Sequence, residues 1–420
     1  MFALVDCNNF YCSCERLFNP GLNKRPVIVL SNNDGCVIAR SDEAKAIGIE
    51  MAVPEYMVRD KIKQSNIAVF SSNYTLYGDI SDRVMKTLTA FVPNIELYSI
   101  DEAFLDMSEL TYTDLLQLGI KIRKTVGQCI GIPVTVGIAP TKTLAKLANR
   151  YAKKNCKDLG VHWLANNELT QQALEFTEIG DVWGIGSQYA SLLNRKGIKN
   201  ALAFTKMPED WVRDKMSVVG LRLLKELKGI PCIEWEFEKK RRKNICTSRS
   251  FGRVSDKKDF MVEALTNHAA ACALKLRREK SCAGKINVFI KTNHFRNQDK
   301  QHEASITLQC QVPTNDTTEI IKYTLKGLDS IFQPGHNYQK CGVIVSDLVT
   351  EDTVQSSFLD TVNRGRNKKV METLDKVNNS LGSEIVRFAI QGFEKRYKLK
   401  ADYLSQRYTT NIDEILHVKN

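Results

Sequence analysis

The sequence predicts a multidomain α+β protein, and three observations lead to that prediction. The chain has 420 residues, a length typical of about three domains. Its first 165 residues alternate strand and helix signals, whereas strand signals disappear between about 170 and 233. From about 248 to 348 strands return in a β-α-β-β-α-β order, which is typical of a second, smaller α+β domain.

Residues 1–165 contain short apolar strands separated by amphipathic helices. Ser41 begins one helix as an N-cap, with acids in the first turn and a terminating Gly48. Residues 95–106 alternate like a β-hairpin whose turn contains Asp101 and Glu102. Further strands are expected at 2–6, 26–30, 36–39, 68–70 and 134–138, and further helices at 81–91, 114–129 and 141–154.

The remaining regions differ from the first. Residues 166–237 contain short helices, among them a helix–turn–helix unit that begins near Trp183. From Lys239 to Lys258 there are nine basic residues, one acid and no apolar face, as expected of an exposed linker. A tail with local helices follows from Glu351. Between linker and tail we expect strands at 286–291, 304–308 and 341–345 and helices at 260–280 and 317–331.

Composition excludes several classes of protein. Hydrophobic residues at 43% and charged residues at 26% exclude a disordered or fibrous chain. The twelve cysteines contain no CxxC pair, so we expect reduced, mostly buried thiols rather than zinc fingers or a disulfide framework. Asp6 interrupts any signal peptide, and the uncharged stretch 125–141 contains two prolines and three glycines, so we expect a cytoplasmic protein with no membrane partner. The net charge of +12 points to a polyanion or phosphate-rich substrate.

Three carboxylates are the strongest candidates for chemistry. Asp6 ends an apolar strand, and Asp101 and Glu102 occupy a hairpin turn. Carboxylates gathered at strand ends repel one another unless cations neutralise them. Two Mg²⁺ ions bridged by such groups activate a hydroxyl and stabilise a leaving pyrophosphate. The alternative is a set of solvated turn acids, which is common for an Asp-Glu pair.

Several motifs, in order along nearly the whole chain, resemble those of one family. Residues 2–11 with Cys14-Glu15, and residues 98–104, resemble the two metal-site motifs of Y-family translesion DNA polymerases. The more specific resemblance is to the UmuC type, the catalytic subunit of bacterial DNA polymerase V, and to its MucB and RumB relatives. The motifs that support it are residues 31–40, 70–74, 137–149, 181–186, 248–252 and 407–410.

The resemblance implies a right-hand polymerase for error-prone translesion synthesis in the SOS response to DNA damage. Palm and fingers would occupy 1–165 (fingers about 12–75), a helix-hairpin-helix thumb 166–237, a basic linker 238–247, a little finger 248–348 and an interaction tail 349–420. Asp6, Asp101 and Glu102 match the catalytic carboxylates, and the carbonyl of Val5 or Cys7 would add a ligand for the two Mg²⁺ ions.

The resemblance also implies a nucleotide site. Tyr11 matches the steric gate, whose ring occupies the space of a ribose 2′-hydroxyl, and Phe10 would pack beside the incoming sugar or base. For Phe10, a core aromatic is the alternative. Lys45 and Lys153 match positions that hold the triphosphate of the dNTP. Asp42 departs from the family pattern because an acid repels phosphate, and Arg40 is expected to compensate.

DNA and protein partners are expected at other positions. The glycines of Gly184-Ile185-Gly186 would let backbone N–H groups approach a phosphate of the template–primer. Residues 355–359 resemble a degenerate sliding-clamp motif with Gln355, Phe358 and Leu359 as contacts, and the tail resembles the region that binds a UmuD′-like dimer; RecA is a further expected partner. The basic residues expected to follow the DNA backbone are Arg241, Arg242, Lys243, Arg249, Lys285, Lys291 and Arg296.

Two other functions remain open from the sequence. A palm with paired acids also occurs in nucleotidyl cyclases, although the glycine turn and the basic segment are not needed for a small substrate. A non-catalytic DNA-binding or regulatory subunit could keep the fold, although the retained carboxylates count against it.

Overall fold

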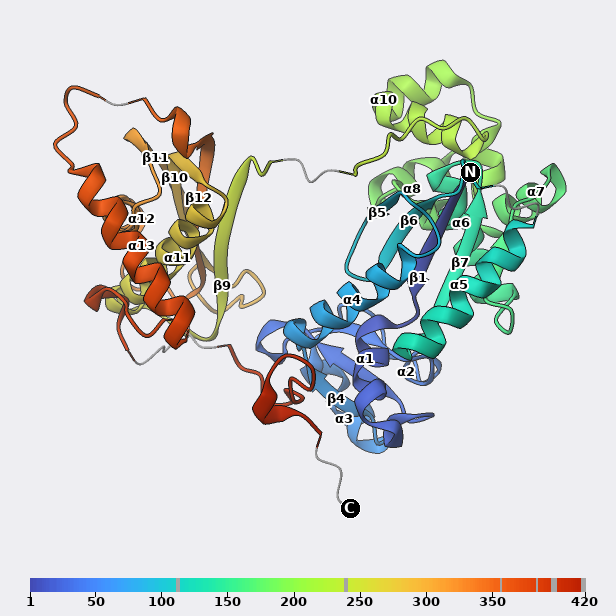
Figure 1. Ribbon diagram of the computed structural model, residues 1–420, viewed down its shortest axis with the longest axis horizontal. Coiled ribbons are helices and arrows are strands. Elements are labelled where there is room, and N and C mark those ends of the chain that lie inside the picture. Colours follow the sequence, from blue (N-terminus) through green and yellow to red (C-terminus); the bar gives the residue numbers. More distant parts are fainter. Residues whose placement is uncertain (111–113, 238–240, 356, 383, 394–398, 417–420) are drawn as a thin grey trace. The chain divides into compact units, whose positions relative to one another are not determined.

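The computed structural model describes residues 1–110, 114–237, 241–355, 357–382, 384–393 and 399–416. The chain forms two compact units (Figure 1): unit 1 contains Met1–Lys239 and Ala401–Asn420, and unit 2 contains Lys240–Lys400. The chain therefore passes between the units twice, and its end belongs to unit 1. No helix in the described ranges is both long and apolar enough to cross a membrane.

A five-stranded sheet with the order β5-β6-β1-β7-β8 forms the centre of unit 1. Neighbouring strands are antiparallel except β7 and β8, which are parallel. Helices α4 and α5 contribute to the core on one face, and α6 contributes to the core on the other. The bounds are β1 Phe2–Cys7, β5 Ile95–Leu97, β6 Glu102–Asp106, β7 Val134–Ala139, β8 Val161–Trp163, α4 Tyr74–Leu88, α5 Leu115–Ile130 and α6 Lys142–Asn155.

Strand β1 is buried on both faces, and its residues alternate between the two cores. Ala3 and Val5 belong to the core that contains α4 and α5, whereas Phe2 and Leu4 belong to the core that contains α6. Gly137 of β7 allows α6 to lie close, because a Cβ there would meet the backbone nitrogen of Asn149 at 2.2 Å. This packing makes α6 the helix that faces the even-numbered residues of β1.

A second sheet of unit 1, with the order β3-β2-β4, lies within residues 12–75, the range in which the sequence analysis expects the fingers. Its helix α1 was not predicted, because Phe, Tyr, Cys and Ser at its start are only moderate helix formers. Helix α3 and strand β8 were also missed, and α4 begins seven residues before the predicted helix. The bounds are β2 Val27–Leu30, β3 Val37–Arg40, β4 Ala68–Ser71, α1 Phe10–Phe18, α2 Asp42–Ala46 and α3 Glu55–Gln64.

Residues 166–237 are helical, as the sequence predicts, and they share the core of α6. Buried Glu226 joins them to α6, since its carboxylate accepts from the backbone N–H groups of Thr143 at 3.1 Å, Cys232 at 2.6 Å and Ile233 at 3.2 Å. The helices are α7 Asn167–Phe176, α8 Ser187–Arg195, α9 Ala201–Thr205 and α10 Glu209–Leu227.

Unit 2 contains a four-stranded sheet with the order β11-β10-β12-β9 and two helices in the β-α-β-β-α-β order that the sequence predicts. The helices pack on one face of the sheet around a single core. The bounds are β9 Asn244–Ser255, α11 Lys258–Arg278, β10 Ser281–Thr292, β11 Glu303–Thr314, α12 Thr317–Ile331 and β12 Tyr338–Thr350.

The expectation of an exposed linker over residues 239–258 is wrong for most of that range. Residues 238–240 lie outside the described residues, but from Asn244 the chain is strand β9, paired with β12. Ile245 and Phe251 are buried in the core of unit 2, so an apolar face does exist. Two buried apolar side chains among many basic and hydroxyl residues were too few to predict a strand from alternation.

Most of the expected tail is part of the two compact units: its first portion belongs to unit 2 and its last portion to unit 1. Helix α13 (Arg364–Leu381) is held to α11 by Arg277, whose guanidinium pairs with both carboxylate oxygens of Asp375 at 2.7 and 2.8 Å. Beyond it, the carbonyl of Gln391 accepts from the side-chain amide of Asn267 on α11 at 2.7 Å. Residues 401–416 belong to unit 1 instead.

All twelve cysteines are free thiols, and seven of them are buried, as the composition predicts.

Candidate active site

The three predicted carboxylate residues lie at neighbouring strand ends in unit 1. Asp6 of β1 is directly opposite Glu102 of β6, and opposed residues of an antiparallel pair point to the same face. This is the face of Leu4, because residues two apart on a strand share a face, so both carboxylates point toward α6. The backbone N–H of Cys7 donates to the carbonyl of Asp101 at 2.9 Å, which fixes Asp101 beside the end of β1.

Two lysines of α6 neutralise two of these carboxylates. Lys153 Nζ lies 2.6 Å from Asp6 Oδ1, and Lys146 Nζ lies 3.0 Å from Glu102 Oε1. Burial raises the pKa of Asp6 from 3.8 to about 6, with the positive charge of Lys153 opposing this shift and the negative charge of Glu102 adding to it. Burial therefore disfavours the ionised form of Asp6, and a bound cation would stabilise that form.

An aromatic cluster holds Lys146 in place. Its ammonium group lies 4.3 Å from the ring centroid of Tyr98 and 5.3 Å from that of Trp183. The indole N–H of Trp183 donates to the Tyr98 hydroxyl at 3.0 Å, so the turn before α8 contacts the carboxylate hairpin directly.

The oxygen donors at this end of the sheet fit Mg²⁺, which prefers carboxylate and carbonyl ligands. Within the described ranges, no three acidic, histidine or cysteine side chains are already arranged around one metal position. The carboxylate of Asp101 accepts from the Ser99 hydroxyl at 2.6 Å. Val5 lies within the strand, and Cys7 lies at its end. Burial raises the pKa of the Cys7 thiol, so the atom that Cys7 offers to a metal ion is its backbone carbonyl oxygen.

Two cavities adjoin at Lys153 and Lys154. The carboxylate cavity, of about 320 Å³, is lined by Asp6, Glu102, Lys146 and these two lysines among others. The lysine cavity, of about 300 Å³, has lining residues that include Asn8, Asn9, Asp42, Lys45, Lys153, Lys154 and Lys157. The predicted residues Lys45 and Lys153 are thus brought to one cavity, next to the carboxylates.

Lys45 is paired within the lysine cavity. Its ammonium group donates to Asn9 Oδ1 at 2.5 Å and to Asp42 Oδ1 at 2.8 Å. Burial opposes ionisation of Asp42, but the hydrogen bonds from Lys45 and Asn9 outweigh it and lower the pKa of Asp42. Arg40 lines neither cavity, and its guanidinium donates to the carbonyl of Ile49.

The two aromatic residues after β1 have different surroundings. Phe10 is only 3% exposed and packs in the core that contains α4 and α5, so the structure supports the core alternative and not a contact with a ligand. Tyr11 is half-buried, and its ring stacks on Tyr77 with centroids 4.5 Å apart and planes 15° apart. Tyr74 meets the edge of Tyr11 at 6.0 Å.

The glycine turn has the geometry that the sequence suggests. Gly184 has a φ of +91°, which a residue with a side chain adopts only with strain. Ile185 is buried and anchors the turn, and Gly186 is the N-cap residue of α8. The first backbone N–H groups of α8 have no partner within the helix, which suits them to bind a phosphate.

The predicted basic residues of unit 2 do not all lie on one face. Lys285 and Lys291 alternate with core residues of β10, so they lie on the face of the sheet that the helices leave open. Arg249 is directly opposite Cys341, which is buried in that core, so Arg249 lies on the helix-covered face and the expectation of a shared surface is wrong for it.

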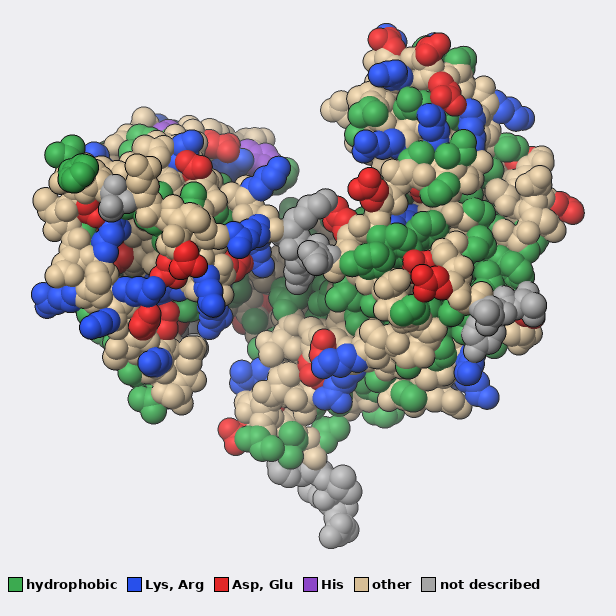
Figure 2. Space-filling view, turned by 45° about the horizontal axis from the view of Figure 1, so that its top comes forward, with side chains coloured by type: hydrophobic (Ala, Val, Ile, Leu, Met, Phe, Trp, Pro, Cys, Tyr) green, Lys and Arg blue, Asp and Glu red, His purple; other side chains and the backbone are tan. Residues whose placement is uncertain are grey.

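The other predicted basic residues lie outside the sheet. Arg241, Arg242 and Lys243 are exposed just before β9, and Arg296 follows β10. Lys and Arg side chains of unit 2 are interspersed with acidic ones (Figure 2), as in the pairs Lys291–Glu303 at 2.9 Å and Arg296–Asp299 at 3.3 Å.

The clamp-like motif is open to solvent. Phe358 is 110% exposed and Leu359 84% exposed, whereas Ser356 lies outside the described residues. Gln355 is exposed as well. An exposed apolar pair of this kind is available to a partner surface.

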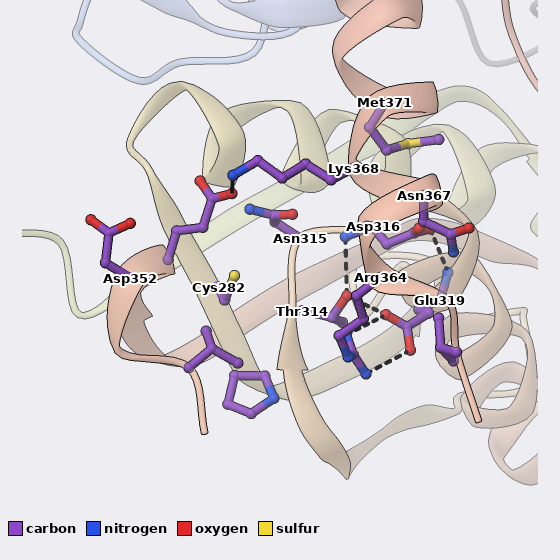
Figure 3. Close-up of a pocket in the computed structure, with 15 residues that line it drawn as sticks. Cys282, Thr314, Asn315, Asp316, Glu319, Asp352, Arg364, Asn367, Lys368 and Met371 are labelled. Atoms are coloured by element: carbon purple, nitrogen blue, oxygen red, sulfur yellow. Dashed lines mark hydrogen bonds and ion pairs between the residues drawn. The ribbon is translucent and has the colours of Figure 1, made fainter. Parts of the chain in front are cut away.

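A separate cavity of about 280 Å³ lies in unit 2 where the tail meets the sheet domain (Figure 3). Four of its charged groups form two ion pairs: Arg364 with Glu319 at 3.2 Å, and Lys368 with Glu351 at 2.6 Å. These pairs fasten the start of α13 to the sheet domain.

Several residues of the site were not predicted. Lys146, Lys154 and Lys157 line the two cavities together with Lys153. The sequence does contain their signal, because basic residues recur at helical spacing along residues 141–157. Tyr77, by contrast, lies in a helix that was predicted to begin after it.

Comparisons with known proteins identify the class. The fold is that of a Y-family DNA polymerase chimera of Dbh and Dpo4, which matches with a TM-score of 0.66 and 21% identity over 83% of this chain and 100% of that chain. Models of the impB/mucB/samB family and of its C-terminal domain match residues 5–150 and 242–358. A domain of unknown function (DUF4113) matches residues 368–418.

Curated relatives match the whole chain. Protein UmuC of Salmonella typhimurium strain LT2 is 42% identical over 100% of both chains, and Protein ImpB of Salmonella typhimurium is 38% identical over 99% of both. The chain therefore belongs to the impB/mucB/samB family. These matches confirm the predicted fold class and the prediction of a Y-family translesion DNA polymerase of the UmuC type.

Proposed function

We propose that this polymerase uses Asp6, Asp101 and Glu102 to add a dNTP to a primer 3′-hydroxyl on a template. The observation that supports this most directly is the register of Asp6 opposite Glu102, with Asp101 bonded to the end of the same strand. The carbonyl of Cys7 is a better candidate for a further ligand than that of Val5, because Cys7 ends the strand. When bound, two Mg²⁺ ions would activate the hydroxyl and stabilise the leaving pyrophosphate.

The lysines beside the carboxylates have a second role in this proposal. Lys153 lines both cavities, so its ammonium group is placed to exchange Asp6 for the triphosphate of the dNTP. Lys45 and the unpredicted Lys154 and Lys157 add positive charge to the lysine cavity, which offsets the acid at Asp42. Because Arg40 bonds to a backbone carbonyl instead, we propose no phosphate contact for it.

Tyr11 is the proposed steric gate. Stacking on Tyr77 fixes its ring, and a fixed ring can exclude a ribose 2′-hydroxyl more strictly than a mobile one. We propose no sugar contact for Phe10, because it is buried in the core.

DNA contacts are proposed at the glycine turn and on unit 2. The turn Gly184–Gly186 presents the start of α8 to a phosphate, and Lys285 and Lys291 present charge from the open face of the sheet. Arg241, Arg242, Lys243 and Arg296 are proposed to add to this backbone contact. Binding of template–primer DNA would place the protein on the nucleoid.

Protein partners are proposed for the exposed parts of the tail. Gln355, Phe358 and Leu359 are available to a sliding clamp because they are exposed. A UmuD′-like dimer and RecA are proposed on the strength of the family resemblance, with no individual contact assigned.

Asp101→Ala tests the proposed chemistry. The substitution removes a metal ligand but no basic residue, so primer extension should be lost while binding to template–primer DNA remains. Both are measured on one preparation, by primer extension and by fluorescence anisotropy. Equal loss of both would contradict the assignment. A cyclic nucleotide made from NTP without a primer would support the cyclase alternative instead.

A further inference from the structure

Residues 401–416, here called the C-terminal strap, return from unit 2 and lie on the fingers region of unit 1, near β4 and α1 (Figure 1). Four motifs that characterise this sequence meet there: Cys14-Glu15, residues 31–40, residues 70–74 and residues 407–410. The proposed function gives no role to this meeting point.

The strap extends the pairing at the end of β4. The backbone N–H of Ser71 donates to the carbonyl of Tyr403 at 3.0 Å, and the backbone N–H of Tyr403 donates to the Ser71 hydroxyl at 3.0 Å. The backbone N–H of Asp402 donates to Asp34 Oδ2 at 2.9 Å. Further along, the ring of Tyr408 stacks on Phe18 of α1 with centroids 4.6 Å apart.

The strap also supplies partners to buried polar groups of the fingers. The side-chain amide of Asn73, which is 3% exposed, donates to the carbonyls of Ser405 and Gln406, both at 3.2 Å. Glu15 is 2% exposed, and one of its oxygens accepts from the Ser405 hydroxyl at 3.0 Å. Buried polar groups are costly when unpaired, so the fingers are built to hold the strap.

A chain of contacts leads from the strap to the proposed gate. The Glu15 oxygen that accepts from Ser405 also accepts from the Tyr77 hydroxyl at 2.6 Å. Burial raises the pKa of Tyr77, so this hydroxyl keeps its proton and remains a donor. The ring of Tyr77 then stacks on Tyr11.

We propose that the C-terminal strap positions the nucleotide site: Ser405 orients Glu15, Glu15 orients Tyr77, and Tyr77 holds the ring of Tyr11 against the sugar. The strap thereby sets the discrimination between deoxyribonucleotides and ribonucleotides. This inference rests on the proposed gate role of Tyr11. Ser405, Glu15 and Tyr77 are positioning residues, since they act through Tyr11.

The test is a double-mutant cycle between Ser405→Ala and Tyr11→Ala. The readout is the ratio of kcat/KM for a dNTP to that for the matching rNTP; taken on one preparation, it does not depend on the fraction of folded protein. Ser405→Ala removes a hydrogen bond to the buried carboxyl group of Glu15, and discrimination should fall about 3- to 10-fold. In the Tyr11→Ala background the same substitution should change nothing further.

Three further variants serve as controls for the cycle. Ser380→Ala removes a serine hydroxyl from the same tail, which among the described residues donates to carbonyls within α13, and it should leave discrimination unchanged. Glu15→Gln keeps an oxygen acceptor and should retain more discrimination than Glu15→Leu.

Three outcomes would overturn the inference: unchanged discrimination in Ser405→Ala, an undiminished effect of Ser405→Ala in the Tyr11→Ala background, or equal loss in Glu15→Gln and Glu15→Leu. If Tyr11→Ala itself leaves discrimination unchanged, the gate assignment fails first, and the inference fails with it. The two failures are distinguished by the Tyr11→Ala variant alone.

Discussion

The two large sheets of this protein are buried to different extents, and the difference decides where each can present charge. In unit 1, β1 and β7 are covered on both faces, and every residue of β7 is buried. In unit 2, helices cover one face only, and the residues of β10 and β11 largely alternate between more buried and more exposed. A doubly covered strand favours an uninterrupted apolar run, whereas a singly covered strand favours alternation.

This comparison explains two kinds of functional surface. In β1, β6 and β7 of unit 1, charged side chains lie only at or next to strand ends, and Asp6 and Glu102 converge there on a small volume beside α6. In unit 2, Lys285 and Lys291 are spread along an open face. A point of converging carboxylates suits chemistry on one phosphate, and a spread of cations suits contact with a nucleic-acid backbone.

The largest expected effect distinguishes an acid of the converging site in unit 1 from an acid on the open face of unit 2. Glu102→Gln removes charge from the converging site and should lower kcat/KM for primer extension about 10³-fold, because metal charge stabilises the transition state by several kcal/mol. Glu303→Gln removes an exposed acid from the open face of unit 2 and should change extension less than about 2-fold. Similar losses in both would break the comparison.

The next effect tests why the sheet of unit 1 is covered on its α6 face. Glu226→Ala leaves the backbone N–H groups of buried Thr143 and half-buried Cys232 and Ile233 without their acceptor, so the free energy of unfolding should fall by about 2–3 kcal/mol. Urea denaturation measures it. Glu209→Ala, which removes a more exposed acid of α10 with lysine partners 3.7 and 3.9 Å away, should cost no more than about 0.5 kcal/mol. An equal loss of unfolding free energy in both variants would contradict the role of Glu226 in joining α10 to α6.

The smallest effect concerns the open face of unit 2. The double variant Lys285→Ala, Lys291→Ala should weaken binding to template–primer DNA roughly 10-fold at moderate salt and reduce the slope of log K against log salt by about 2. Arg249→Ala should leave the slope unchanged, because Arg249 lies on the helix-covered face. A change of slope in Arg249→Ala alone would reverse the assignment of faces.

Sequence reasoning succeeded where a local pattern determined the structure. The alternation and turn at residues 95–106 predicted the hairpin, and family motifs predicted that Asp6 and Glu102 belong to one site. It failed for Arg249, because β9 contains few apolar residues and its pairing with β12 depends on a strand about ninety residues later.

The C-terminal strap could not be predicted for a related reason. Its contacts join residues more than 300 positions apart, as in Asn73–Ser405, and they are mainly backbone and side-chain hydrogen bonds. Such contacts produce no periodic pattern of apolar residues. The motifs at both ends of these contacts were visible in the sequence, but only the coordinates show that they meet.

Binding of Mn²⁺, measured by electron paramagnetic resonance in the presence of template–primer DNA and a non-hydrolysable dNTP analogue, tests the central claim most directly. We predict two bound ions per chain, and loss of at least one in Asp101→Ala with the DNA still bound. Full occupancy in the variant, or no bound ion in the unaltered protein, would show that these carboxylates do not form the metal site.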